Sequence, residues 1–256
     1  DGVLEIYGSM QHPFSTRRFV SALLNEPFAA IEVYTIPVGG GFGGKDDNAA
    51  AVCARAALGA RITGKPVKLT YDRTWSVRET YKRHPYTMRY KMGFSSEGKI
   101  EAVGASIYAD SGAHLSVTPW VTWRSIAQCC GPYAVDHVQA DVYGVATNHV
   151  FRGAMRGFGA PQVNFAIEQL IDMGAHRLKI HPLGIRRMNM VKQNGQTVTG
   201  QVLDTHTVSL EEVMNSVVHR IGYRKKYEQC SRGVSDSDDL YGIGLAVSYR
   251  GSSLGA

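Results

Sequence analysis

Five of the six residues from Gly39 to Gly44 are glycines, and this loop joins a β-rich segment, 31–38, to an alanine-rich stretch that begins near Asp46. Glycine reaches backbone conformations that other residues avoid, so clustered glycines shape the main chain for a particular contact. A glycine loop before a helix can direct backbone N–H groups at an anion. The segment therefore predicts a strand, a ligand-binding loop and a helix.

The same loop fits two nucleotide-binding patterns, each incompletely. Gly39–Gly44 has the spacing of the dinucleotide fingerprint, and with Lys45 it has that of a P-loop. A P-loop needs Ser or Thr after the lysine, where this chain has Asp46, a carboxylate that would repel phosphate. The dinucleotide fold needs an acidic residue about 20 positions further on, and Asp72 comes later than that. A nucleotide-binding domain with this loop as its phosphate cradle, and a tight structural turn, both remain alternatives.

A second glycine-rich segment spans residues 148–162 and repeats the dipeptide Arg-Gly at Arg152 and Arg156. Glycine beside arginine lets the backbone approach a ligand while a guanidinium stays close. Phe158 stands between two glycines, so its ring is free to stack on a flat ligand. A buried phenylalanine in a glycine-rich loop is the plainer alternative.

Hydrophobic periodicity predicts both strands and helices. The expected strands are 3–7, 31–38, 67–71, 86–94, 99–108 and 138–145. One helix is expected to begin at Asp46 or Asp47 and to be ended by residues 64–66, and the other expected helices are 163–173, 182–190 and 210–221. Ser209 and Glu212 have the spacing of a capping box for the last helix. The elements do not alternate strictly, which favours an α+β fold of mixed-sheet layers with packed helices.

Composition excludes several classes of protein. The 256 residues are 44% hydrophobic and 20% charged, as in ordinary globular domains. No stretch approaches the roughly 18 apolar residues of a membrane span, and the positive charges behind the net charge of +6 are spread along the chain. We therefore expect neither a membrane nor a nucleic-acid partner. The four cysteines lack metal-site spacing, which favours reduced thiols in a cytoplasmic protein.

The two glycine-rich segments together are more specific than either alone. Gly39–Lys45, followed about 110 residues later by Arg156–Gln162, resembles the molybdenum hydroxylase family, the xanthine dehydrogenase and aldehyde oxidase group. Shorter matches at residues 9–11, 83–85 and 187–190 extend the resemblance over most of the chain. It implies a molybdopterin-binding domain fold, with 1–256 as the first half of that region in two interleaved α+β subdomains. The second half is expected to be absent from this chain.

The resemblance also implies an activity and partners. It indicates one part of a multi-chain molybdenum-dependent oxidoreductase, inactive without its other half, that hydroxylates an N-heterocycle with oxygen from water. A xanthine- or hypoxanthine-like purine is the first candidate substrate, consistent with purine metabolism, and a nicotinate-like pyridine is the second. The implied partners are the second half of the molybdopterin region, a [2Fe–2S] subunit and an FAD subunit. The cytosine dinucleotide form of molybdopterin, and a structural subunit whose site has decayed, remain open.

Site residues follow from the matched positions. Gln11 matches the glutamine that hydrogen-bonds the apical oxo group, and no side chain is expected to bind the metal directly. The other residues expected to contact the cofactor are Gly41, Phe42, Gly43, Ala154, Met155 and Arg156, although the family often has Phe at position 155.

Three residues match positions that contact the substrate. Asp46 falls where purine-oxidising members carry a glutamate one methylene longer. Arg124 falls where the same members place an arginine on the substrate, and Phe158 matches a ring that stacks on it. The resemblance thus assigns catalytic roles to Arg124 and Gln11, because an arginine can stabilise negative charge that develops on a ring. A helix cap at Asp46, a surface arginine at Arg124 and an ordinary strand residue at Gln11 are the plainer alternatives.

Overall fold

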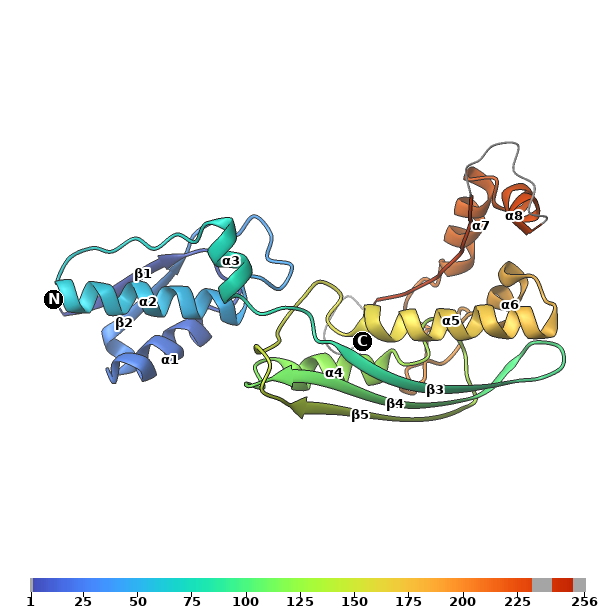
Figure 1. Ribbon diagram of the computed structural model, residues 1–256, viewed down its shortest axis with the longest axis horizontal. Helices are drawn as coiled ribbons and strands as arrows, with labels where there is room; N and C mark the ends of the chain where they lie inside the picture. Colours follow the sequence, from blue (N-terminus) through green and yellow to red (C-terminus); the bar gives the residue numbers. More distant parts are fainter. Residues whose placement is uncertain (1, 232–240, 251–256) are drawn as a thin grey trace. The chain divides into compact units, whose positions relative to one another are not determined.

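The computed structural model describes residues 2–231 and 241–250, and these form two compact units that alternate along the chain (Figure 1). The first unit comprises residues 1–85, 109–121 and 144–158. The second comprises residues 86–108, 122–143 and 159–256. Both units contain strands and helices, which confirms the α+β class.

The first unit is built on two parallel strands, β1 (Leu4–Gly8) and β2 (Ile31–Thr35). They are connected by α1 (Pro13–Leu24) and the 3-10 turn η1 (Phe28–Ala30). The helix α2 (Asp47–Thr63) packs on β1 and α1, and α3 (Arg73–Glu79) follows it. A small apolar core lies between the helices and one face of the strands, formed by Ile6, Val20, Ile31, Ala54 and Ala57.

A mixed three-stranded sheet lies mainly in the second unit, in the order β3 (Tyr86–Phe94), β4 (Ile100–Gly112) and β5 (His137–Ala146). The last residues of β4 and β5, 109–112 and 144–146, belong to the first unit. A tight turn closes the β3–β4 hairpin, since Ser95 N–H donates to Lys99 O at 2.8 Å. Contacts from Lys99 to Asp136 and from Asp110 to Thr147 have the same sequence offset, so β4 and β5 run parallel. The two kinds of pairing in this sheet fulfil the mixed-sheet prediction.

Five helices complete the fold: α4 (Thr118–Ala127), α5 (Ala160–Leu178), α6 (Pro182–Asn189), α7 (Leu210–Arg220) and α8 (Tyr223–Ser231). The long helix α5 packs against β3 and α6. Between α5 and the sheet lies the larger apolar core, which includes Ile107, Ile167 and Ile171, each fully buried.

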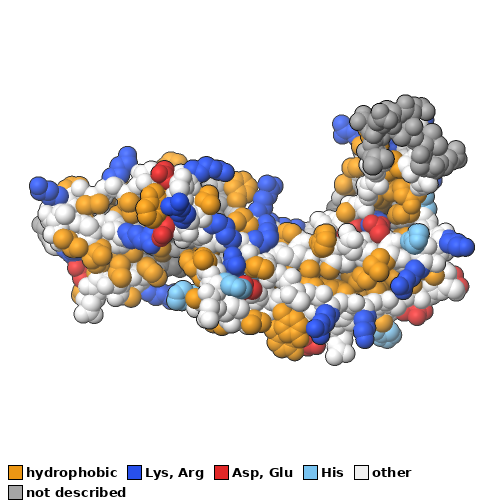
Figure 2. Space-filling model, in the orientation of Figure 1, with side chains coloured by type: hydrophobic (Ala, Val, Ile, Leu, Met, Phe, Trp, Pro, Cys, Tyr) orange, Lys and Arg blue, Asp and Glu red, His pale blue; other side chains and the backbone are white. Residues whose placement is uncertain are grey.

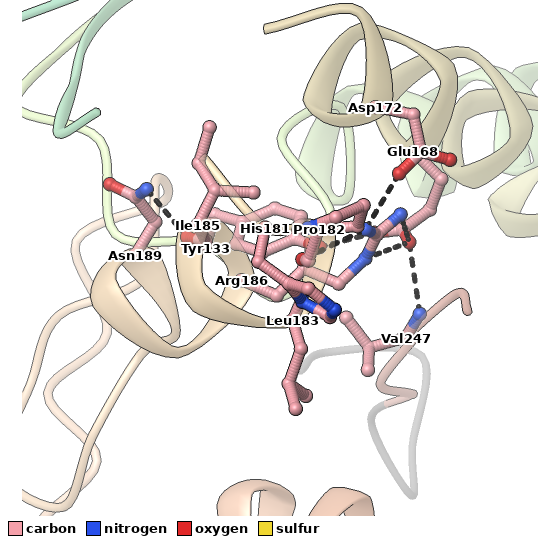
Figure 3. A network of polar contacts seen from close by, with 10 residues as sticks. All are labelled: Tyr133, Glu168, Asp172, His181, Pro182, Leu183, Ile185, Arg186, Asn189 and Val247. Atoms are coloured by element: carbon pink, nitrogen blue, oxygen red, sulfur yellow. Dashed lines mark hydrogen bonds and ion pairs between the residues drawn. The ribbon is translucent and has the colours of Figure 1, made fainter. Parts of the chain in front are cut away.

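A buried polar network sits beside that core (Figure 3). Arg186 on α6 is fully buried and bonds Glu168 on α5, Nε to Oε2 at 3.0 Å, and Asp172, Nη1 to Oδ1 at 2.7 Å. Glu168 also accepts the hydroxyl of Tyr133 and, at 3.0 Å, the backbone N–H of Val247. One carboxylate therefore joins two helices, a loop and the segment 241–250.

Most of the expected elements are confirmed, several with longer bounds. The prediction of a strand at 67–71 is wrong: this segment pairs with no other strand among the described residues. Ser209 is the N-cap of α7 as expected, but its side chain makes no capping hydrogen bond, so the predicted capping box is wrong. The helices α1, α3, α4 and α8 were not predicted. No helix in the described part of the chain is long and apolar enough to cross a bilayer.

Candidate functional site

The glycine loop between β2 and α2 has the conformation that its composition predicts. Gly39, Gly40, Phe42 and Gly43 have φ angles of 63°, 102°, 51° and 97°, the left-handed region that glycine tolerates best. Within the described part of the chain, the backbone N–H groups of residues 39–43 donate no hydrogen bond. Phe42 is itself 64% exposed. The loop therefore offers a run of unpaired donors to a ligand.

The two glycine-rich segments meet through their backbones. The N–H of Arg156 donates to Phe42 O at 3.0 Å, and the Arg156 guanidinium lies 5.3 Å from the centre of the Phe42 ring. A Cβ on Gly43 would lie 2.3 Å from Ala154 O and 2.8 Å from Met155 N. Only a glycine at position 43 allows this approach, so the two loops form one surface.

Tyr81 contacts both loops where they meet, and it was not predicted from the sequence. The side chain is 2% exposed, and its hydroxyl donates to Gly43 O. Its ring leaves no room for a Cβ on Gly153, which would come within 2.5 Å of the ring. Its N–H donates to Asn48 Oδ1 at 3.3 Å. Tyr81 thus fixes both loops to α2; the only signal in the sequence was its place just before Arg83-His84-Pro85, which resembles the family.

Gln11 lies beside the same loop, after the end of β1. Its backbone N–H donates to Lys45 O at 2.8 Å. Its side-chain Oε1 would be 2.6 Å from a Cβ on Gly41, so the amide lies against the glycine backbone. The residue is exposed, which leaves the amide available to a ligand. Gln11, residues 41–43 and residues 154–156, all expected to bind the cofactor, therefore come together in the first unit.

Asp46 is the N-cap residue of α2, but its side chain accepts no capping hydrogen bond. It lies 3.3 Å from His12 Nε2 and its side chain is 12% exposed. Burial raises the pKa of Asp46, the neighbouring Asp47 raises it further, and His12 opposes the change. The carboxylate is therefore a half-buried group held near the glycine loop rather than a helix cap.

Phe158 follows the second loop in a left-handed conformation. Its φ is 53°, between Gly157 at 97° and Gly159 at 95°, and its N–H donates to Met155 O at 2.8 Å. A non-glycine residue with positive φ is uncommon and marks a locally constrained backbone. The constraint fixes the position of the Cβ atom that carries this half-buried ring at the end of the loop.

Arg124 is the predicted site residue that belongs to the second unit. It lies on α4, is 3% exposed and has its guanidinium 5.8 Å from the Trp123 ring. Burial lowers its pKa, nearby Arg250 lowers it further and Tyr249 opposes the change. A buried arginine excludes the surface-arginine alternative. The effects of Arg250 and Tyr249 on its pKa also show that the segment 241–250 lies near α4.

A polar cluster supports the second loop and was also missed. Asp110 accepts Thr147 Oγ1 at 2.6 Å and His149 Nδ1 at 2.6 Å, and Arg152 lies 3.8 Å away. Burial alone would raise the pKa of Asp110, but the hydrogen bonds from Thr147 and His149 outweigh it and lower the pKa to about 2.

His84 lies in the first unit, is 2% exposed and contacts Thr118 Oγ1 at 2.8 Å. Burial, together with Arg152, lowers its pKa to about 4. The imidazole is therefore neutral at pH 7 and contributes shape and hydrogen bonding rather than charge.

The donor set decides which kind of ligand the site fits. No group of three His, Cys, Asp or Glu side chains in the described residues could hold a metal ion. The loops offer instead backbone N–H groups, the Gln11 amide and a close backbone approach at Gly43. Such a surface fits a cofactor that brings its own metal ligands and presents oxygen or sulfur acceptors.

Comparison with known proteins identifies the family. Residues 1–190 match the family model described as the molybdopterin cofactor-binding domain, so the chain belongs to this family, in the molybdenum hydroxylases. The chain is 36% identical over 88% of its length to the nicotinate dehydrogenase large molybdopterin subunit of Eubacterium barkeri, and covers 53% of that protein. It is 30% identical over its whole length to a subunit of the probable xanthine dehydrogenase of Bacillus subtilis, covering 33% of that protein.

Solved structures agree. The aldehyde oxidoreductase of Desulfovibrio gigas aligns with a TM-score of 0.78 at 28% identity, over 90% of this chain and 25% of that one. The quinoline 2-oxidoreductase of Pseudomonas putida aligns with a TM-score of 0.73 at 27% identity, over 90% of this chain and 30% of that one. The chain thus spans about half or less of the length of these relatives. The alternative of a nucleotide-binding domain is not favoured.

Proposed function

We propose that this chain supplies the first half of the molybdopterin-binding region of a multi-chain molybdenum hydroxylase. The observation that carries the proposal is the joining of the two glycine-rich loops at Gly43 and Ala154, in a chain of the molybdopterin cofactor-binding family. The remaining half of the region, a [2Fe–2S] subunit and an FAD subunit would be separate cytoplasmic chains.

In this proposal the first unit holds the cofactor. The Gln11 amide and the unpaired N–H groups of residues 39–43 donate to the cofactor's acceptor atoms, and no side chain ligates the metal. Residues 154–156 form the second wall. When bound, molybdenum–molybdopterin supplies the two-electron redox chemistry that places oxygen from water on an electron-poor carbon. The pterin takes either its simple or its cytosine dinucleotide form.

The chain's own residues bind and polarise the substrate. Phe158, which stands between two glycines at the end of the second loop, stacks on a flat ring. Burial raises the pKa of Asp46. Its carboxyl group donates to a ring nitrogen when protonated and accepts a hydrogen bond from a ring N–H when ionised. Arg124 stabilises negative charge that develops on the ring, an effect that is strong where the guanidinium is buried.

An acid and an arginine suit an N-heterocycle better than a simple aldehyde. Relatives point to two such classes, since one is named a nicotinate dehydrogenase and another a probable xanthine dehydrogenase. A purine remains the first candidate and a pyridine carboxylate the second. Steady-state oxidation of xanthine, hypoxanthine, nicotinate and benzaldehyde by the assembled enzyme separates them; preference for benzaldehyde would contradict the assignment.

The first test is the molybdenum content of the complex purified from its native host through a tag on this chain. We expect stoichiometric molybdenum by elemental mass spectrometry. A complex with its partners but without molybdenum, from cells supplied with molybdate, would overturn the proposal. In the loaded enzyme, Arg124→Ala should lower kcat by about 100-fold with molybdenum retained. Arg177→Ala, at an exposed position of α5, is the matched control.

A further inference from the structure

Residues 241–250 form a segment of the second unit that is anchored to the core of that unit. Its hydrophobic side chains pack on the larger apolar core, and the residues between them are exposed. The backbone N–H of Val247 donates to Glu168 Oε2 at 3.0 Å (Figure 3). Because Glu168 is itself held by Arg186, this bond fixes where the segment crosses the core. Arg250 lies three residues further on and is therefore within about 11 Å of a fixed point.

The helix α4, which carries Arg124, ends on the same core. Cys129 and Cys130 lie just after α4, are almost fully buried and belong to the cluster that also contains the anchored segment. Burial raises the pKa of Tyr249 and these two thiols raise it further, so Tyr249 lies beside the end of α4. The next residue, Arg250, is near enough to Arg124 to add to the effect of burial on its pKa. Two arginines from distant parts of the chain thus come together in the second unit.

The two arginines differ in their access to solvent. Arg124 is 3% exposed, whereas Arg250 is an exposed residue. In the described part of the chain, Arg250 forms no ion pair with a carboxylate. Like charges repel each other more strongly when one of them is buried, because the surroundings screen them less than water does. An anion bound by both guanidinium groups would remove that repulsion and accept charge-assisted hydrogen bonds from each.

The charge of the chain suits an anionic small molecule. On the face shown in Figure 2, lysine and arginine side chains are spread over the surface and acidic side chains are fewer. The net charge is +6. Such an excess of positive charge raises the local concentration of anions around the protein. A guanidinium group then selects among them, since its planar set of N–H donors matches the oxygens of a carboxylate or a similar planar anion.

We propose that Arg250 is a specificity-determining residue that acts with Arg124 to select flat ring substrates carrying an anionic oxygen. The inference rests on the proposed function, which places Arg124 on the substrate. The anionic oxygen belongs to a carboxylate, as in a pyridine carboxylate, or to an ionised ring oxygen, as in a purine. Arg250 binds this charge in the ground state, whereas Arg124 also stabilises charge that develops during the reaction. Loss of Arg250 therefore weakens binding more than it slows turnover.

Benzoate and benzamide, two flat rings of similar size that differ in charge, test the proposal by titration calorimetry on the tag-purified enzyme. Benzoate should bind about tenfold more tightly than benzamide, and Arg250→Gln should remove most of that difference. Arg220→Gln, which removes the same charge at an exposed position of α7, should preserve it. Equal binding of the two ligands by the unmodified enzyme would overturn the inference. An acidic side chain of another subunit that already neutralises the two arginines would give that result.

Steady-state kinetics separate the two sources of the anionic oxygen. If it is a carboxylate, Arg250→Gln should raise KM for nicotinate about tenfold, change kcat little and leave KM for nicotinamide unchanged. If it is a ring oxygen, the variant should raise KM for xanthine only at pH values at which the ring is ionised. Arg250→Lys, which keeps the charge, should recover part of the loss.

The outcomes also distinguish this inference from the proposed function. An equal change in KM for charged and neutral substrates, or a fall in kcat alone, would overturn the role of Arg250 and leave the proposed function intact. A complex that prefers benzoate to benzamide but contains no molybdenum would instead overturn the proposed function.

Discussion

Different interactions stabilise the interior of each unit. In the first, two loops more than a hundred residues apart meet backbone to backbone at Gly43 and Ala154, and the Tyr81 hydroxyl donates to Gly43 O. In the second, a fully buried Arg186 joins α5 and α6 through Glu168 and Asp172 beside a large apolar core (Figure 3). The first arrangement leaves donors open for a ligand; the second pairs its buried charges internally. The two units thus differ in where their hydrogen bonds go.

Removing the buried cation should have the largest effect. Arg186→Met leaves Glu168 buried and uncompensated, so we expect a loss of about 3–5 kcal/mol in the free energy of unfolding of the second unit. Urea denaturation followed by circular dichroism measures it. Arg187→Met is the control, because Arg187 is half-exposed and bonds Asn215 at the surface. Equal losses for the two variants would remove the contrast between the units.

The glycine contact should come next. Gly43→Ala puts a methyl group 2.3 Å from Ala154 O at a φ of 97°, and we expect about 2–4 kcal/mol of destabilisation with loss of molybdenum from the enzyme. Gly39→Ala is the matched control, with positive φ but no atom within 4 Å of its Cβ. Full molybdenum content in Gly43→Ala would show that the close approach is not needed to bind the cofactor.

Acid should weaken the first unit through His84. Its pKa falls from 6.5 to about 4 on folding, so the unfolded chain takes up the proton first as the pH drops. Stability present above pH 6.5 is therefore lost progressively down to pH 4, by about 2 kcal/mol between pH 7 and pH 5. Thermal denaturation at a series of pH values measures this loss. His84→Gln should flatten the profile; an unchanged slope would assign the effect to other groups.

The smallest effect should come from loss of the Tyr81 hydroxyl. Tyr81→Phe keeps the ring that packs on Gly153 and removes the bond to Gly43 O, for about 1 kcal/mol. Burial raises the pKa of Tyr81, so the hydroxyl stays protonated across the accessible pH range. Tyr86→Phe, which removes a hydroxyl bond to Ser125 in the second unit, gives the comparison. A larger loss of stability in Tyr86→Phe than in Tyr81→Phe would show that the hydroxyl bond in the second unit contributes more than the one in the first.

The sequence was informative where structure is local. The β3 bounds, the Pro182 start of α6 and the left-handed glycine loop follow from periodicity, proline geometry and glycine content. It was misleading where partners decide: 67–71 has the pattern of a strand but no strand beside it among the described residues.

The site itself was predicted by family resemblance rather than by local pattern. Neither loop alone indicates that Gly43 meets Ala154, because that contact joins distant segments. Tyr81 and Asp110 escaped notice for the same reason, since a single tyrosine or aspartate has no local signature. The predicted roles of Asp46, Arg124 and Phe158 stay predictions until variants are measured.

The backbone contact between the two loops also orders events during synthesis. The ribosome extends the chain at about 5–20 residues per second, so the glycine loop waits several seconds before the segment that completes it has emerged. Until then its unpaired amides have only water as partner. The joined surface of the two loops therefore forms only after residues 154–156 have emerged, and the cofactor binding proposed for it has to follow that step.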